Sequence, residues 1–304
     1  MSYVLGPNQY GKAENRVVRV YRDTARHEIR DLNVSTALRG AFGDAHTTGD
    51  QAAVLPTDTQ KNTAFAFAKE HGVTSPEDYA LALGARFLEA CEAASGSRIE
   101  VEEYAWDRIS VDGQGHDHAF VRRGGEVRTT VVTRDRAGDQ AWVVSGLKDL
   151  VVLKSTGSEF KGYLKDEYTT LQETDDRILA TSLVARWRYE APAGGSYDVD
   201  WNKCYDDIKR VLLETFATTY SRALQESLYA MGSAVLDTHA EVAEIKFSAP
   251  NKHHFLVDLS PFGTENNGEV FIAADRPYGL IEATVQRDGG SDAGDAWLTV
   301  PGFC

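Results

Sequence analysis

Apolar and polar residues alternate along two neighbouring stretches near the N-terminus, RVVRVYRD at 16–23 and HEIRDLNVSTAL at 27–38. A period of two is typical of strands that bury one face, and the short connection favours an antiparallel hairpin. The next stretches, 56–72 and 75–96, repeat their apolar residues at helical spacing. Ser75 followed by a proline is typical of a helix start, so the second helix is expected to begin there.

The same order of elements occurs a second time along the chain. Further strands are predicted at 98–110, 126–135, 140–157, 178–190, 243–249, 253–259 and 279–287, and a second helical region at 205–239. Each half then combines an antiparallel sheet with helices on one face, which predicts an α+β architecture in duplicate, with domains at 1–146 and 147–304. Such a sheet leaves its other face and its edges bare, and assembly of several copies into a closed barrel is an economical way to cover them.

The second helical region is expected to break at ATTYS, residues 217–221. Consecutive threonines weaken a helix, and Ser221 is a good N-cap for a new one. The break places Leu224 and Gln225 in the first turn of the new helix. Backbone N–H groups there lack intrahelical partners and can donate to a ligand oxygen.

Composition and charge limit the possible partners. The chain has 304 residues and a formal net charge of −14, with no run of Lys or Arg, which argues against nucleic-acid binding. An anionic substrate therefore requires specific Arg or Lys side chains at close range. No stretch approaches the ~18 consecutive apolar residues of a membrane helix, and the N-terminus lacks signal-peptide features, so we expect a soluble, cytoplasmic protein without membrane partners.

Cysteine and histidine spacing gives little support for metal binding. Cys91, Cys204 and Cys304 lie far apart without CxxC spacing, so we expect buried thiols instead of a disulfide framework or a thiolate site. His116 and His118 form an HxH pair that on a strand could bind a metal from one face, but a third ligand is not evident. No phosphate-binding glycine motif occurs, so a nucleotide cofactor is unsupported.

Several polar positions are notable without identifying a function by themselves. Thr57 followed by Gln60 fits a helix capping box, and Asp58 is an equally good cap. Lys12 lies just before the first strand and Arg177 begins a later one, where charges are usually solvated.

The segment PNKHHF at 250–255 places an amide and two imidazoles side by side in the sequence. If this segment is extended, Asn251, His253 and Phe255 share one face. A hydrogen-bonded surface histidine is the simplest interpretation of this pattern taken alone.

Six segments, in order, resemble hallmark segments of the urate oxidase (uricase) family. They are NQYGKAENRVVRVYR, TDTQKNT, LKSTGSEFKGYLKDEYTTLQETDDRILAT, RALQESLY, PNKHHFLVDL and DRPYGLIEATVQR, and they run through nearly the whole chain. The resemblance implies two tandem tunnelling-fold domains per chain and a homotetramer around a central tunnel. It also implies oxidation of urate by O2 and water to 5-hydroxyisourate and hydrogen peroxide, with neither metal nor organic cofactor.

The resemblance implies substrate-binding roles for residues of the second half. Phe160 resembles the aromatic residue on which the purine stacks. Arg177 and Gln225 resemble a two-sided clamp on the substrate edge, where a guanidinium and an amide satisfy carbonyl acceptors and ring N–H donors. Leu224 resembles the residue whose main-chain N–H meets a substrate carbonyl.

It also implies a proton relay and an oxygen site. Lys12, Thr57 and His253 resemble the relay, and Asn251 resembles the amide above the ring where O2 and then water bind. Thr57 and Asp58 resemble residues that face the substrate from a neighbouring subunit. A lysine acts as a base only when neutral, which requires burial or a positive neighbour.

Two alternatives remain open at this level. One is a metal-dependent tunnelling-fold enzyme that uses His116, His118 and another histidine on a pterin-like substrate, which chelator sensitivity would distinguish. The other is a non-catalytic purine-binding tetramer, which loss of the urate absorbance band with stoichiometric peroxide would exclude.

Overall fold

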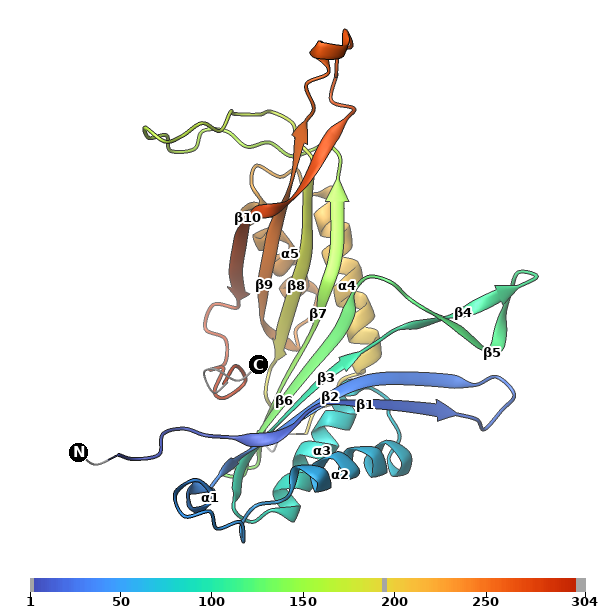
Figure 1. Cartoon of the computed structure of the whole chain (residues 1–304), viewed down its shortest axis with the longest axis vertical. Coiled ribbons are helices and arrows are strands. Elements are labelled where there is room, and N and C mark those ends of the chain that lie inside the picture. The colour runs from blue at the N-terminus through green and yellow to red at the C-terminus, as the bar shows by residue number, and fades with distance from the viewer. Residues whose placement is uncertain (1–2, 193–195, 299–304) are drawn as a thin grey trace. The chain divides into compact units, whose positions relative to one another are not determined.

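The computed structural model describes residues 3–192 and 196–298 (Figure 1). The chain divides into two compact units. The first comprises the residues up to Gly146, Trp187–Tyr205 and the segment from Ser291, and the second comprises Leu147–Arg186 and Asp206–Gly290. Because this division follows contacts and not repeats of a fold, the predicted tunnelling-fold domains at 1–146 and 147–304 remain a prediction.

The first unit is an antiparallel sheet with helices on one face. Its elements are β1 (Tyr10–Tyr21), β2 (Glu28–Gly40), α1 (Gly43–Thr47), α2 (Thr57–Glu70), α3 (Pro76–Ala90), β3 (Ala94–Glu103), β4 (Trp106–Val111), β5 (Gln114–Arg122), β6 (Val127–Asp135) and the first half of β7 (Gln140–Lys154). The strand order is β1-β2-β3-β6, and β4 and β5 form a separate ribbon.

The core of the first unit lies between this sheet and the two long helices, α2 and α3, which run side by side in Figure 1. Leu83 and Phe87 of α3 are fully buried, as are Leu32 and Leu38 of β2. Along β2 the half-buried Asn33, Ser35 and Ala37 alternate with buried residues, so the predicted alternation is confirmed for this strand. Ser75 caps α3 as expected, since its side chain accepts the Asp78 N–H.

A buried ion pair anchors the start of α3. Glu77 is fully buried, and its carboxylate accepts hydrogen bonds from Arg128 at 2.6 Å, Thr130 at 2.9 Å and Ser145 at 2.6 Å. A buried carboxylate requires such partners, because an unpaired charge in the interior is very costly.

The second unit repeats the arrangement of strands and helices. Its elements are the rest of β7, β8 (Leu179–Tyr189), α4 (Trp201–Thr218), α5 (Leu224–Thr238), β9 (Val242–Leu256), a 3-10 helix (Ser260–Phe262) and β10 (Phe271–Gln286). The unit boundaries fall within β7, β8 and α4, so each of these has residues in both units. The strand order is β7-β8-β9-β10, and β9 and β10 pair antiparallel. The predicted α+β class with antiparallel sheets is confirmed.

Helix α5 packs closely on β9 and β10. Leu228 and Met231 are buried against this sheet together with Phe247. At Gly232 a Cβ atom would lie 2.5 Å from a methyl group of Val285, so the helix approaches β10 as closely as it does only because this residue has no side chain.

The opposite face of this sheet carries exposed apolar side chains on β7 and β10. Val151 and Leu153 of β7 are 59% and 52% exposed, and Leu280 of β10 is 53% exposed. By strand alternation these side chains lie on the face away from α4 and α5. Exposed apolar surface of this kind marks an interaction site, which agrees with the expectation of a bare sheet face.

Several predicted boundaries were wrong. β1 begins at Tyr10, so Lys12 lies within this strand and not before it, and β10 begins at Phe271 and not at Gly279. Ala94–Gly96, predicted as helical, begin β3, and the strand predicted at 98–110 forms parts of β3 and β4. The strands predicted at 243–249 and 253–259 are one strand, β9. Cys91 and Cys204 are buried, as expected, whereas Cys304 lies outside the described residues. Among the residues described, no helix combines the length and the apolar character needed to cross a membrane.

Candidate active site

The predicted site residues fall into two groups. Those of the second unit are Phe160, Arg177, Leu224, Gln225, Asn251 and His253, and those of the first unit are Lys12, Thr57 and Asp58. Each group is described within its own unit below.

Arg177 lies over the ring of Phe160. Its Cζ atom is 5.1 Å from the ring centroid, within the range of a cation–π contact. Phe160 is held in place by two backbone hydrogen bonds with Thr174, of 2.9 and 3.1 Å, and its ring stacks on Tyr163. Burial lowers the pKa of Arg177. Because no carboxylate pairs with this guanidinium among the described residues, the site favours an anionic, planar ligand.

The break between α4 and α5 is confirmed, and it places Leu224 and Gln225 in the first turn of α5. Leu224 is buried and Gln225 is exposed. The assignment of Ser221 as N-cap was wrong, because Ala223 takes that position and the Ser221 hydroxyl donates to the Ala223 carbonyl at 2.9 Å. A helix leaves its first N–H groups without intrahelical partners, so this turn presents donors to a ligand oxygen.

Asn251 and His253 lie on β9, where both are half-buried. Asn251 pairs with Gly279 and His253 with Ala274, on either side of an irregularity in the β9–β10 register. The rings of His253 and Phe255 are 5.8 Å apart and inclined by 22°, which fits the predicted shared face.

His253 lies in an environment that disfavours its charged form. Burial, then the charge of Arg177 and then His254 lower the pKa of His253 below its usual 6.5. The imidazole is therefore neutral at neutral pH and able to accept a proton. Since Arg177 acts on His253 and also contacts Phe160, the second unit brings these three residues into one neighbourhood.

Lys12 lies on β1 beside a bulge in its pairing with β2, where the register shifts between Lys12 and Asn15. Its backbone N–H donates to the Thr36 hydroxyl at 3.2 Å, and that hydroxyl donates to Gln60 of α2 at 2.7 Å. Bulges are common next to active sites, where they redirect a side chain.

The capping-box interpretation of Thr57 and Gln60 was wrong. Pro56 occupies the N-cap position of α2, and no side chain caps this helix. Thr57 is already the first helical residue, and Gln60 is fully buried, bonded to Thr36. Capping therefore does not explain the threonine, and its hydroxyl is available for another role.

Asp58 directs its carboxylate along α2. It binds Lys61 and accepts a hydrogen bond from Asn62 at 3.0 Å. The Lys61 contact is the main cause that lowers the pKa of Asp58, and the charge of Lys12 contributes as well. Lys12 and Asp58 therefore lie within electrostatic reach of each other in the first unit.

His116 and His118 lie on β5 with their ring centroids 4.5 Å apart, and His27 is 5.9 Å from His118. Among the described residues, no group of three metal-ligating side chains with converging ligand atoms includes either member of the pair. The metal-dependent alternative therefore has no third ligand, within the part of the chain that is described, to join His116 and His118.

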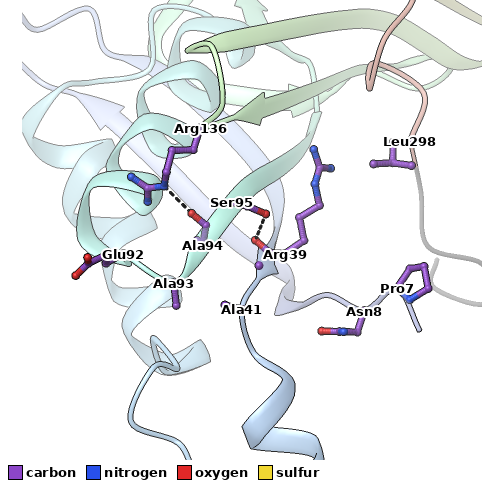
Figure 2. Close-up of a pocket in the computed structure, with 11 residues that line it drawn as sticks. Pro7, Asn8, Arg39, Ala41, Glu92, Ala93, Ala94, Ser95, Arg136 and Leu298 are labelled. Atoms are coloured by element: carbon purple, nitrogen blue, oxygen red, sulfur yellow. Dashed lines mark hydrogen bonds between the residues drawn. The ribbon is translucent and has the colours of Figure 1, made fainter. Parts of the chain in front are cut away.

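A pocket of about 550 Å³ in the first unit contains none of the predicted site residues (Figure 2). Its lining includes Pro7, Arg39, Arg136 and Leu298. Arg39 pairs with Asp295 at 2.7 Å, and the Nε of Arg136 donates to the backbone carbonyl of Ala94 at 2.8 Å. Both arginines already have protein partners, which makes this pocket a weaker candidate for binding an anion than the surroundings of Arg177.

Sequence reasoning missed Ser158, which binds Arg177, and it gave Ser221, which precedes α5, a different role. Both are fully buried, and the Ser158 hydroxyl accepts a hydrogen bond from the Arg177 Nε at 3.2 Å. A small polar residue in a loop gives no periodic signal, so only the structure shows that Ser158 is buried against Arg177.

Comparisons with known proteins identify the family of the chain. The chain matches the family model described as Uricase over residues 8–133 and 143–282. A uricase from Arthrobacter globiformis is 54% identical over 301 residues, which cover 99% of this chain and 96% of that protein. A uricase from Cyberlindnera jadinii is 36% identical over 298 residues, which cover 94% and 98% of the two chains.

The fold agrees as well. The crystal structure of the Arthrobacter globiformis uricase matches with a TM-score of 0.91, covering 98% of this chain and 99% of that one. The resemblance predicted from six ordered segments is therefore confirmed over nearly the whole length. Matching in both halves, in sequence and in fold, this chain belongs to the uricase family.

Proposed function

We propose that this oxidoreductase converts urate, O2 and water to 5-hydroxyisourate and hydrogen peroxide, without a metal or an organic cofactor. The observation that carries the proposal is the partly buried guanidinium of Arg177, which lies over Phe160 and within electrostatic reach of His253. A planar anion suits Phe160 and Arg177, because its ring stacks on the aromatic side chain and its charge pairs with the guanidinium.

The remaining polar groups suit the two edges of a purine trione. Arg177 and the amide of Gln225 satisfy its carbonyl oxygens and ring N–H groups, and the first turn of α5 at Leu224 supplies a backbone donor. Asn251, on the same strand as His253, is the amide proposed to hold O2 and afterwards water against the ring.

In the proposed reaction, proton transfer takes the place of a cofactor. Dioxygen reacts slowly with closed-shell molecules, so the enzyme must make urate electron-rich, which removal of a further proton achieves. The resulting dianion passes an electron to O2, peroxide forms at a ring carbon, and water replaces it there, releasing hydrogen peroxide. His253, neutral because of its environment, accepts a proton, and Lys12 and Thr57 complete the relay.

The proposed enzyme is a homotetramer in which each site is shared between subunits. One chain contributes Phe160, Arg177 and Gln225, and the neighbouring chain contributes Thr57 and Asp58, with Lys12 accompanying them. The carboxylate of Asp58 would repel a urate anion, so we assign the substrate contact to its backbone carbonyl. In support, that carboxylate is already bound to Lys61 and Asn62.

The first test is a urate oxidation assay on the purified protein. Loss of the urate absorbance band with one peroxide formed per urate supports the proposal, whereas urate binding without turnover would favour the non-catalytic alternative. A second measurement follows activity after exhaustive EDTA treatment together with metal analysis. Activity is expected to persist without a stoichiometric ion; activity abolished by the chelator and restored by a metal would contradict cofactor independence.

A further inference from the structure

Two buried serines lie behind the proposed substrate clamp in the second unit. Ser158 follows β7 and Ser221 lies between α4 and α5, and both are fully buried. Their segments pair through the backbone. The Ser221 N–H donates to the Gly157 carbonyl at 3.0 Å, and the Glu159 N–H donates to the Ser221 carbonyl at 2.9 Å. Buried polar groups whose hydrogen bonds are satisfied hold their partners in fixed positions.

Ser158 binds Arg177 at two points. The Arg177 backbone N–H donates to the Ser158 carbonyl at 2.8 Å, and the side-chain Nε–H donates to the Ser158 hydroxyl at 3.2 Å. The first bond holds the Arg177 backbone beside Ser158, and the second orients the Nε edge of the guanidinium toward the Ser158 hydroxyl. The two Nη groups remain as a planar fork, and in the part of the chain that the structure describes they have neither a hydrogen-bond acceptor nor a carboxylate partner.

Ser221 connects the same segment to α5. Its hydroxyl accepts a hydrogen bond from Ser227 at 2.8 Å and donates to the Ala223 carbonyl at 2.9 Å. Ala223 immediately precedes Leu224, so the paired serines join Arg177 to the first turn of α5. The two arms of the clamp are therefore placed relative to each other and not independently.

We propose that Ser158 is a positioning residue: its hydroxyl orients the Arg177 fork, and its pairing with Ser221 fixes the distance from that fork to α5. The inference rests on the proposed function, because it requires that Arg177 contact the substrate. A clamp of fixed width and orientation selects planar ligands that present carbonyl and ring N–H groups along their edges, as purine diones and triones do.

The test compares Ser158→Ala with the matched variant Thr156→Ala in the full chain. Thr156 lies in the same segment, but its hydroxyl binds the carboxylate of Asp176 at 2.9 Å. A hydrogen bond to a charged group changes binding by about 10- to 100-fold. Ser158→Ala is expected to raise the KM for urate and the Kd for the purine dione xanthine by such a factor, and Thr156→Ala is expected to leave both within about 2-fold of wild type.

A second background separates positioning from a general effect on folding. In Arg177→Lys the side chain has no Nε–H to bind Ser158, so Ser158→Ala should there add less than about 2-fold. If Ser158→Ala raised KM and Kd by the same factor in the wild-type and Arg177→Lys backgrounds, the proposal would be overturned. An unchanged KM and Kd in the wild-type background would also overturn it.

Two further outcomes are covered by the same design. If Ser158→Ala does not fold, Ser158→Cys keeps the side-chain size with a weaker acceptor, and its effect must likewise depend on Arg177. If Arg177→Lys itself binds urate and xanthine as tightly as wild type, the proposed substrate site is wrong. That result is distinct from a normal Arg177 effect with no effect of Ser158.

Discussion

Burial, and after it the charge of the nearby Arg177, lower the pKa of the His253 imidazole. The same guanidinium therefore serves two purposes in the proposed mechanism: it attracts the urate anion, and together with burial it favours the neutral form of His253 that accepts a proton. Sequence alone gives the identity of both residues through the family resemblance. It does not give their electrostatic coupling, because they are far apart in the chain and only the fold brings them together.

The pH dependence of kcat/KM tests the state of His253. Since its pKa is lowered, the neutral form is lost only at acidic pH, so kcat/KM should rise through a midpoint below 6.5 and then level off. In His253→Gln this acidic limb should disappear. In the control His254→Gln the limb should remain, with its midpoint unchanged or shifted upward, because His254 contributes to the lowered pKa. A wild-type midpoint above 6.5 would contradict the assignment.

Lys12 and Thr57 provide a second test at the residue scale. Groups that act as one proton-transfer unit give non-additive losses. Lys12→Met combined with Thr57→Ala should therefore reduce kcat little more than the more harmful single change. Losses in kcat that multiply would show that the two residues act separately.

At the scale of elements, sequence patterns predicted which helices and strands exist better than they predicted where these elements begin and end. The break at 217–221 was predictable because threonines disfavour a helix, yet the cap was not, because Ser221 is turned toward the Ala223 carbonyl by its buried neighbours. Thr57 failed as a cap for a similar reason: the proline before it ends up at the N-cap position. In both cases the local spacing of hydroxyl residues does not decide which residue takes the N-cap position.

The buried Glu77 at the start of α3 gives a stability prediction at this scale. Removing one partner of a buried ion pair costs about 3–5 kcal/mol, so Glu77→Gln should strongly lower the free energy of unfolding. In the control Arg86→Ala, which removes an exposed pair with Glu89 on the same helix, the loss should stay below about 1 kcal/mol. Urea denaturation at one fixed protein concentration measures both, and similar losses in the two variants would contradict the role assigned to Glu77.

At the scale of the whole molecule, the proposed site combines residues of the first unit with residues of the second unit. In the proposed homotetramer these two groups come from different subunits. The apolar side chains of Val151, Leu153 and Leu280 are exposed in one chain, which supports assembly of several copies. The family resemblance goes further and assigns Thr57 and Asp58 to a neighbouring subunit. That assignment depends on contacts between chains, so neither periodicity nor the fold of one chain could have predicted it.

Co-expression of two inactive variants tests the shared site. Arg177→Ala is expected to lose the substrate clamp and Thr57→Ala to break the relay, so each should be nearly inactive alone. At a two-fold interface between one copy of each variant, one pocket holds both defects and the other holds neither. With random mixing of equal amounts, roughly a quarter of all pockets should be intact, and activity should reappear at a sizeable fraction of wild type. If each site lay within one chain, every pocket would carry its own chain's defect and no activity would return. Absence of recovery, in samples whose mixed oligomers are verified by mass spectrometry, would therefore show that the site is not shared.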